Sequence, residues 1–141
     1  MDRKKLPAIK QAVHNAERDY VYQKSGFNPS LDNRVFGTAG PRDAIYWAMP
    51  VDHFVTYVDE LGLGTGQSLG ILGTGFGLDA FYAATRFMRV TGFEIDLDIY
   101  NAAEEIRASF DVRNITFRNQ DFLEADLCTF NVVSFFFAFL P

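Results

Sequence analysis

The stretch LGLGTGQSLGILGTGFGLDAF, residues 61–81, contains the spacing G-x-G-x-G twice. The glycines form two triads, the first being Gly62, Gly64 and Gly66 and the second Gly73, Gly75 and Gly77. A triad with this spacing can wrap the backbone around a nucleotide-like ligand, because glycine adopts left-handed conformations and allows close approach. Such ligands bind where a loop leaves a strand and begins a helix, so the residues on either side of each triad decide between them.

The second triad has the flanks of a ligand-binding loop. An apolar strand is predicted over 68–73, and the segment 78–88 predicts a helix that begins just after the last glycine. The first triad instead ends a helix predicted over 50–63, with Gly62 as a left-handed C-cap and the following residues as a linker. We therefore expect the ligand cradle to be the second loop, formed by Gly73, Thr74, Gly75, Phe76 and Gly77.

The rest of the chain predicts alternating strands and helices joined by short connections. Strands are predicted over 89–95, 114–119 and 130–139, and helices over 6–22 and 96–110, the latter capped by Asp96 or Asp98. This order predicts an α/β fold, a three-layer Rossmann-like parallel sheet with helices on both faces and an N-terminal helical extension. We expect residues 1–49 to form the extension, with a long loop at 25–41 and a short helix at 42–48, and residues 50–141 to form the Rossmann-like domain. The helix side chains expected to face inward include Tyr20, Phe54, Val58, Leu61, Ala80, Phe81, Ala84, Met88, Ile99, Ala103, Ile106 and Phe110.

Composition excludes several classes of protein. The chain has 141 residues, 48% of them hydrophobic, which is enough for one domain with a buried core. A single cysteine, Cys128, excludes an internal disulfide, and His14 and His53 lack the spacing of a metal site. Neither a signal peptide nor a membrane span is predicted, so we expect a cytoplasmic protein without membrane contact. Residues 71–141 carry five Arg and ten Asp or Glu, and this acidic half disfavours nucleic acid as a partner.

Two acidic residues follow later strands and extend the predicted site. Glu94, with Ile95 beside it, ends the second strand, where a carboxylate can accept both hydroxyls of a ribose; the alternative is a solvated strand-end acid. Asp121 follows the third strand and can accept the amino group of adenine while Phe122 covers the ring; the alternative is a turn or cap residue. A glycine loop and two such acids in this order predict a nucleoside site.

From about Pro50 to Pro141 the chain resembles class I S-adenosylmethionine-dependent methyltransferases. ILGTGFG resembles their first motif, GFEID the end of their second strand, NQDFLEADL their adenine-contacting turn and FNVVSFFFAFLP their fourth strand. The dinucleotide fingerprint G-x-G-x-x-G fits less well, because its third glycine would fall at Leu78. Within the family, DFLEADL and FFFAFLP are also similar to histone lysine methyltransferases of the telomeric-silencing type, although Phe135 and Phe136 stand where those have an Asn-rich turn. A further similarity is to nicotianamine-synthase-like enzymes, which transfer the aminobutanoyl arm of the same cofactor.

Three departures from the family pattern qualify this resemblance. Ile71 stands where the family has an acid two positions before the first glycine, and Asn131 stands where the fourth strand usually begins with an acid. The family fold has seven strands, whereas four are predicted here, so the strand at 131–139 becomes an apolar sheet edge that needs a cover. The N-terminal helix, a second copy of the chain or further sequence could cover it, and we expect a homo-oligomer through this edge.

The resemblance implies S-adenosylmethionine as cofactor and methyl transfer to an amine of a protein or small molecule. Two alternatives stay open: a non-catalytic or degraded module that keeps the fold and acts through oligomerisation, and an aminobutanoyl or aminopropyl transferase. Residues 134–141 would flank the methyl group. Tyr46 or Trp47 would close the pocket, unless both are simply core aromatics. No catalytic residue is singled out.

Overall fold

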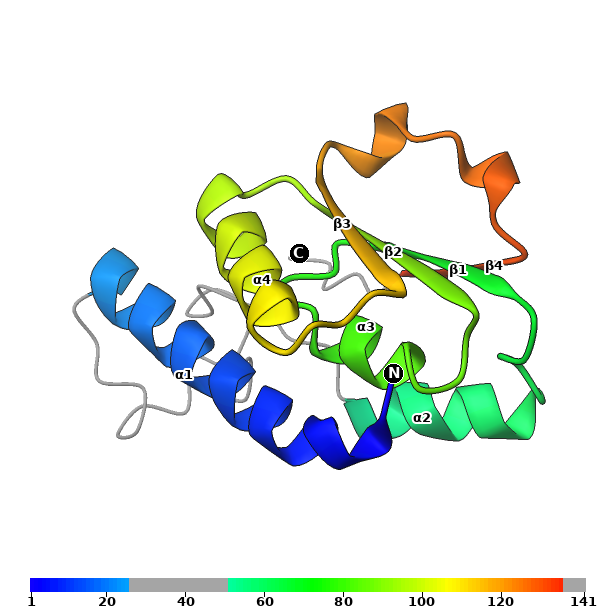
Figure 1. The fold of residues 1–141 in the computed structure, drawn as a ribbon. Helices are drawn as coiled ribbons and strands as arrows, with labels where there is room; N and C mark the ends of the chain where they lie inside the picture. Colours follow the sequence, from blue (N-terminus) through cyan, green and yellow to red (C-terminus); the bar gives the residue numbers. More distant parts are fainter. Residues whose placement is uncertain (26–50, 136–141) are drawn as a thin grey trace.

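The computed structural model describes residues 1–25 and 51–135. Within them, four parallel strands form one sheet in the order β3-β2-β1-β4 (Figure 1). The strands are β1 (Ser68–Leu72), β2 (Arg89–Glu94), β3 (Ile115–Asn119) and β4 (Val132–Phe135). The helices are α1 (Leu6–Ser25), α2 (Val51–Glu60), α3 (Leu78–Ala83) and α4 (Leu97–Ser109), with short 3-10 turns η1 (Arg3–Lys5), η4 (Phe122–Glu124) and η5 (Leu127–Thr129). The predicted α/β Rossmann-like fold is confirmed. The sequence predicts helices on both faces of the sheet, but within the described residues α1 to α4 share a core on one face, and the segment with η4 and η5 crosses the other.

The hydrophobic core lies between one face of the sheet and the helices. Because side chains alternate along a strand, every second residue of β1, β2 and β3 faces this core. Removing these apolar side chains from water is the main driving force for the fold. The core side chains contributed by the three strands are Leu69, Ile71, Val90, Ile115 and Phe117, and those contributed by the helices include Ile9, Val13, Phe54, Val58, Ala80, Phe81, Ile99, Ala103 and Ile106.

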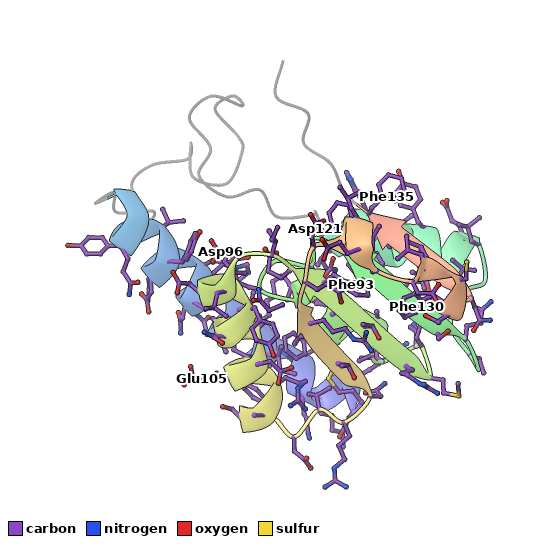
Figure 2. The ribbon with its side chains drawn as sticks, turned by 90° about the horizontal axis from the view of Figure 1, so that it is seen from above. Phe93, Asp96, Glu105, Asp121, Phe130 and Phe135 are labelled. Carbon is purple, nitrogen blue, oxygen red and sulfur yellow. The ribbon has the colours of Figure 1, made fainter. Side chains whose placement is uncertain are left out.

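The opposite sheet face is crossed by the segment that carries η4 and η5. Phe130 lies over β1, so close that a Cβ added to Gly70 would stand 2.8 Å from its ring. The Phe130 ring also meets Phe93 edge-on, with the ring centroids 6.0 Å apart (Figure 2). Glycine at position 70 is therefore required by packing.

The first glycine triad ends a helix, as predicted. Gly62 has φ +63°, and the N–H of Leu63 donates to the carbonyl of Val58 at 3.0 Å, which closes α2 with a left-handed cap. Two inward positions predicted from periodicity are wrong. Leu61 is 69% exposed because α2 ends before it, and Met88 is 56% exposed because α3 ends at Ala83.

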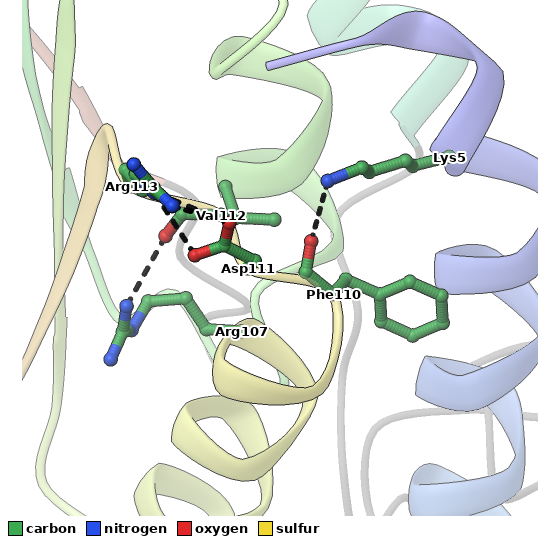
Figure 3. A network of polar contacts seen from close by, with 6 residues as sticks. All are labelled: Lys5, Arg107, Phe110, Asp111, Val112 and Arg113. Atoms are coloured by element: carbon green, nitrogen blue, oxygen red, sulfur yellow. Dashed lines mark hydrogen bonds and ion pairs between the residues drawn. The ribbon is translucent and has the colours of Figure 1, made fainter.

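The N-terminal helix α1 runs antiparallel to α4, and the residue before α1 is hydrogen-bonded to the carboxyl end of α4. The Nζ of Lys5 donates to the carbonyl of Phe110 at 2.8 Å, just beyond the last turn of α4 (Figure 3). Beside it, Arg107 donates to the carbonyl of Val112 at 3.2 Å. The neighbouring ion pair of Arg113 with Asp111 is exposed and contributes little to stability.

Helix α1 shares its core with the rest of the described fold, since it packs against α3 and α4. It is therefore not the cover of the β4 edge, and a second copy or further sequence remain as candidates. The predicted domain boundary at residues 49 and 50 lies outside the described residues, as do the helix expected at 42–48 and all of the loop expected at 25–41 except Ser25, which is the last residue of α1. None of the described helices is both long enough and apolar enough to cross a membrane.

Candidate nucleoside-binding site

The second glycine triad forms a loop at the carboxyl end of β1, as predicted. Gly73, Gly75 and Gly77 have φ values of +71°, +57° and +83°, a conformation that other residues adopt only with strain. The N–H groups of Gly73 and Thr74 both donate to the carbonyl of Phe93, at 3.0 and 2.9 Å, and so hold the loop against the end of β2. Gly77 then begins α3 without a side-chain cap.

The carboxylate of Glu94 joins this loop to the turn that follows β2. Its Oε2 accepts from the N–H of Gly75 at 3.0 Å, and its Oε1 accepts from the N–H of Asp96 at 2.9 Å. Glu94 is partly exposed, and the adjacent Ile95 is 68% exposed although it is apolar. The structure thus brings together the glycine loop and the acid that the sequence places in one site.

Asp121 lies at the same edge of the sheet but has a local structural role. Its Oδ1 accepts from the N–H of Leu123 at 2.9 Å, which caps η4. The turn-residue alternative is therefore correct for this oxygen, while contact with adenine stays a prediction. Figure 2 shows Asp121 and Asp96 along the edge where the strands end, with Glu105 farther along α4. Phe122 is partly buried beside Asp121.

A buried carboxylate supports the glycine loop from α3, and the sequence did not predict this role. Asp79 is 6% exposed, and its Oδ1 accepts from the Thr74 hydroxyl at 3.0 Å and from the N–H of Ala80 at 2.7 Å. Burial raises the pKa of Asp79 to about 6. Ile71, where the family has an acid, is 1% exposed in the core. The carboxylate next to this loop therefore comes from α3, the helix that follows it. An acidic residue in the first turn of the predicted helix was the sequence signal that could have indicated this role.

Tyr20 of α1 also reaches the site, which sequence reasoning missed. Its hydroxyl donates to Oδ2 of Asp96 at 2.9 Å, and its ring meets Phe76 edge-on with centroids 5.7 Å apart. The other oxygen of Asp96 caps α4 by accepting from the N–H groups of Asp98 and Ile99, so the predicted cap is confirmed for Asp96. The available signal for Tyr20 was a phenol at the end of an otherwise apolar stripe.

Other singled-out residues lie away from this site or outside the described part of the chain. The side-chain oxygen of Asn131 accepts from the N–H of Ser68 at 2.9 Å and joins the starts of β4 and β1. These are the amino ends of the strands, whereas the glycine loop lies at the carboxyl ends. The presence of Asn131 where the family has an acidic residue therefore does not affect the candidate site. Tyr46, Trp47 and residues 136–141 are outside the described residues. Across residues 1–25 and 51–135, no cluster of His, Cys, Asp and Glu could hold a metal.

Comparison with solved structures identifies the fold. An RNA methyltransferase from Salinibacter ruber, solved with S-adenosyl-L-homocysteine, has a TM-score of 0.57 at 25% identity, covering 64% of this chain and 60% of its own. A dimethyladenosine transferase from Plasmodium falciparum has 0.57 at 12% identity, covering 65% of this chain and 33% of its own. A methyltransferase dependent on S-adenosylmethionine from Aquifex aeolicus has 0.53 at 18% identity, covering 58% and 46%.

These likenesses confirm the resemblance at the level of the fold. The chain has the Rossmann-like fold of class I S-adenosylmethionine-dependent methyltransferases. It spans 60% of the length of the Salinibacter enzyme and less of the other two. No protein-family model and no curated protein matches the sequence.

Proposed function

We propose that this chain binds S-adenosylmethionine at the carboxyl edge of β1, β2 and β3 and acts as a methyltransferase. The observation that carries the proposal is the contact between the Gly75 N–H and the Glu94 carboxylate, which unites the glycine loop with a strand-end acid. The comparison supports it, because the Salinibacter enzyme with this fold was solved with the demethylated cofactor. The methyltransferase activity of the whole protein and the identity of its methyl acceptor are both part of this proposal.

The residues at this edge fit the chemical groups of the cofactor. The backbone from Gly73 to Gly77 would lie against the methionine and ribose portions, and Glu94 would accept from the ribose hydroxyls. The exposed Ile95 offers an apolar surface to one face of adenine. Asp121 has a second carboxylate oxygen beside the one that caps η4, and it would accept from the adenine amino group, with Phe122 beside the ring.

For methyl transfer, the chain needs to position the cofactor and the acceptor, and it does not need to supply a reactive group. When bound, the cofactor supplies a methyl group on a positively charged sulfur, already activated for transfer. The residues of the site would bind the nucleoside, orient the acceptor in line and exclude water. An amine acceptor must be neutral to attack, so a dry environment at the site favours the reaction.

For the acceptor we propose an amine of a small molecule or of a protein. The acidic balance of residues 71–141 supports this choice over RNA. The Salinibacter neighbour acts on RNA, however, so RNA belongs in the assay as a competing substrate. Methyl transfer to RNA with none to amines would overturn this part of the proposal and leave the cofactor assignment intact.

Calorimetric titration with S-adenosylmethionine and S-adenosylhomocysteine tests the cofactor assignment. Saturable binding of both is expected. Absence of heat and of thermal shift at saturating ligand would favour the second candidate, a degraded module, which the buried Ile71 in place of an acid supports. Product analysis separates the remaining reactions, because methyl transfer yields S-adenosylhomocysteine and aminobutanoyl transfer yields methylthioadenosine.

Glu94→Ala is expected to weaken S-adenosylhomocysteine binding by about 10- to 150-fold, since a hydrogen bond to a charged group is worth about 1.5–3 kcal/mol. The change removes the acceptor for ribose and also the tie between Gly75 and Asp96. Glu105→Ala is the matched control, because Glu105 is exposed on α4 away from the strand ends (Figure 2). Equal affinity of the two variants in titration calorimetry would contradict the role of Glu94.

We also propose a second copy of the chain as the cover of the β4 edge. Val133 and Phe135 are 37% and 59% exposed, and a groove of about 460 Å³ lies between α2 and β4. Val133→Lys should convert a dimer into a monomer in light scattering, because a charge on an edge strand opposes pairing. Met88→Lys is the control and should leave the dimer unchanged, because Met88 is exposed just before β2, a strand that does not pair with β4. A monomeric wild-type chain would contradict the proposal.

A further inference from the structure

Helix α1 is fastened to both ends of α4, and its second fastening lies in the candidate site. Immediately before α1, Lys5 of η1 donates to the carbonyl of Phe110 beyond the last turn of α4. Near the end of α1, Tyr20 donates to Asp96, the N-cap of α4, across 76 residues of sequence. Between these points Ile9 and Val13 are fully buried in the core. The Tyr20 hydroxyl therefore belongs to a helix that is packed into the core between its two hydrogen bonds.

A continuous series of polar contacts leads from this hydroxyl to the glycine loop. Tyr20 donates to Oδ2 of Asp96, the N–H of Asp96 donates to Oε1 of Glu94, and Oε2 of Glu94 accepts from the N–H of Gly75. The Tyr20 ring also contacts Phe76 within the loop. One side chain of α1 thus touches both segments that flank the proposed ribose position.

The electrostatic surroundings keep this phenol a donor. Burial, together with the hydrogen bond to Asp96 and the nearby charges of Asp98 and Glu94, raises the pKa of Tyr20 to about 12. The hydroxyl therefore remains protonated across the pH range in which the protein would be studied. Its partner Asp96 caps α4 through the other oxygen, so both carboxylate oxygens of Asp96 accept hydrogen bonds.

We propose that Tyr20 is a positioning residue of the nucleoside site, which through Asp96 holds the Glu94 carboxylate in the orientation that accepts from ribose. The inference rests on the proposed function, because it assigns Tyr20 to the binding of the same ligand. It makes α1 part of the binding machinery rather than only a cover for α3 and α4. Preorganised carboxylates bind more tightly because their orientation is already set before the ligand arrives.

Tyr20→Phe tests this by removing the hydroxyl while keeping the ring against Phe76. Affinity for S-adenosylhomocysteine is expected to fall about 5-fold, as for loss of one supporting hydrogen bond of about 1 kcal/mol. Tyr22→Phe on the same helix is the control, because Tyr22 is 60% exposed, and it should bind like the wild type. In a Glu94→Ala background, Tyr20→Phe should have no additional effect, since the two residues act as one unit. Unchanged affinity, or additive losses, would overturn the proposal.

Amide hydrogen exchange without ligand makes the test independent of cofactor binding. Tyr20→Phe should accelerate exchange at the N–H groups of Gly75 and Asp96, while the amides of β3 keep their wild-type rates. Unchanged exchange at both N–H groups would overturn the positioning role. If the wild-type chain fails to bind S-adenosylhomocysteine and Tyr20→Phe still accelerates exchange at these N–H groups, the proposed function is refuted and the coupling stands.

Discussion

Gly77→Ala is expected to lower the free energy of unfolding by about 2 to 5 kcal/mol and to abolish nucleoside binding. An added Cβ would lie 2.5 Å from Cζ of Phe117, which is buried under the loop. Forcing extra volume into a packed core costs about 1–3 kcal/mol, and a left-handed conformation costs an alanine about 1–2 kcal/mol more. Because Gly77 also begins α3 at φ +83°, the loop and the helix would move together. Chemical denaturation measures the loss.

Gly73→Ala is the matched control within the same loop. Its φ is +71°, but a Cβ there would meet nothing within 4 Å, so only the conformational cost of about 1–2 kcal/mol applies. Adding Phe117→Leu to Gly77→Ala should recover part of the lost stability, because the smaller side chain makes room for the methyl group. Equal destabilisation by the two alanines would show that backbone strain, rather than the contact with Phe117, governs position 77.

The sequence predicts the frame of the site because that frame depends on local patterns. Apolar runs mark β1 and β2. The glycines that follow β1 can adopt left-handed conformations that other residues reach only with strain. Parallel strands place their carboxyl ends at one sheet edge, so Gly75 and Glu94 meet although the sequence separates them by 19 residues. The capping of α4 by Asp96 is likewise a local signal, confirmed at 2.9 Å to the N–H of Asp98.

The supporting contacts escape such reasoning because they are tertiary. Tyr20 fits the apolar stripe of its helix, and only the packing of α1 along α4 turns its hydroxyl toward Asp96. Helix α3 is shorter than its apolar pattern predicts because the N–H groups of Thr85 and Arg86 donate to carbonyls three residues back, which tightens the chain toward β2. The periodicity that continues to Met88 contains no signal for this turn.

Asp79→Asn is expected to stabilise the protein at neutral pH. Burial raises the pKa of Asp79 from an ordinary value near 3.8 to about 6, so the folded protein binds this proton more tightly than the unfolded chain does. The stabilising contribution of the carboxyl is complete below the unfolded pKa and is lost as pH rises through about 6. At about pH 7.5 the charged form therefore costs up to about 3 kcal/mol, the free-energy equivalent of the pKa difference. Asparagine keeps an oxygen for Thr74 and Ala80 without the charge.

The variant and the wild type should converge in stability as pH falls to about 4, where the aspartic acid is also neutral. Comparing the two across pH isolates Asp79 from Glu17, whose pKa burial also raises and which both proteins retain. Asp52→Asn is the matched control, because Asp52 is the second residue of α2 as Asp79 is of α3, but it is exposed. Its loss should cost a few tenths of a kcal/mol from the helix dipole. If Asp79→Asn were instead the less stable protein at neutral pH, the charge of Asp79 would be stabilising the glycine loop from α3, and burial would not control its titration.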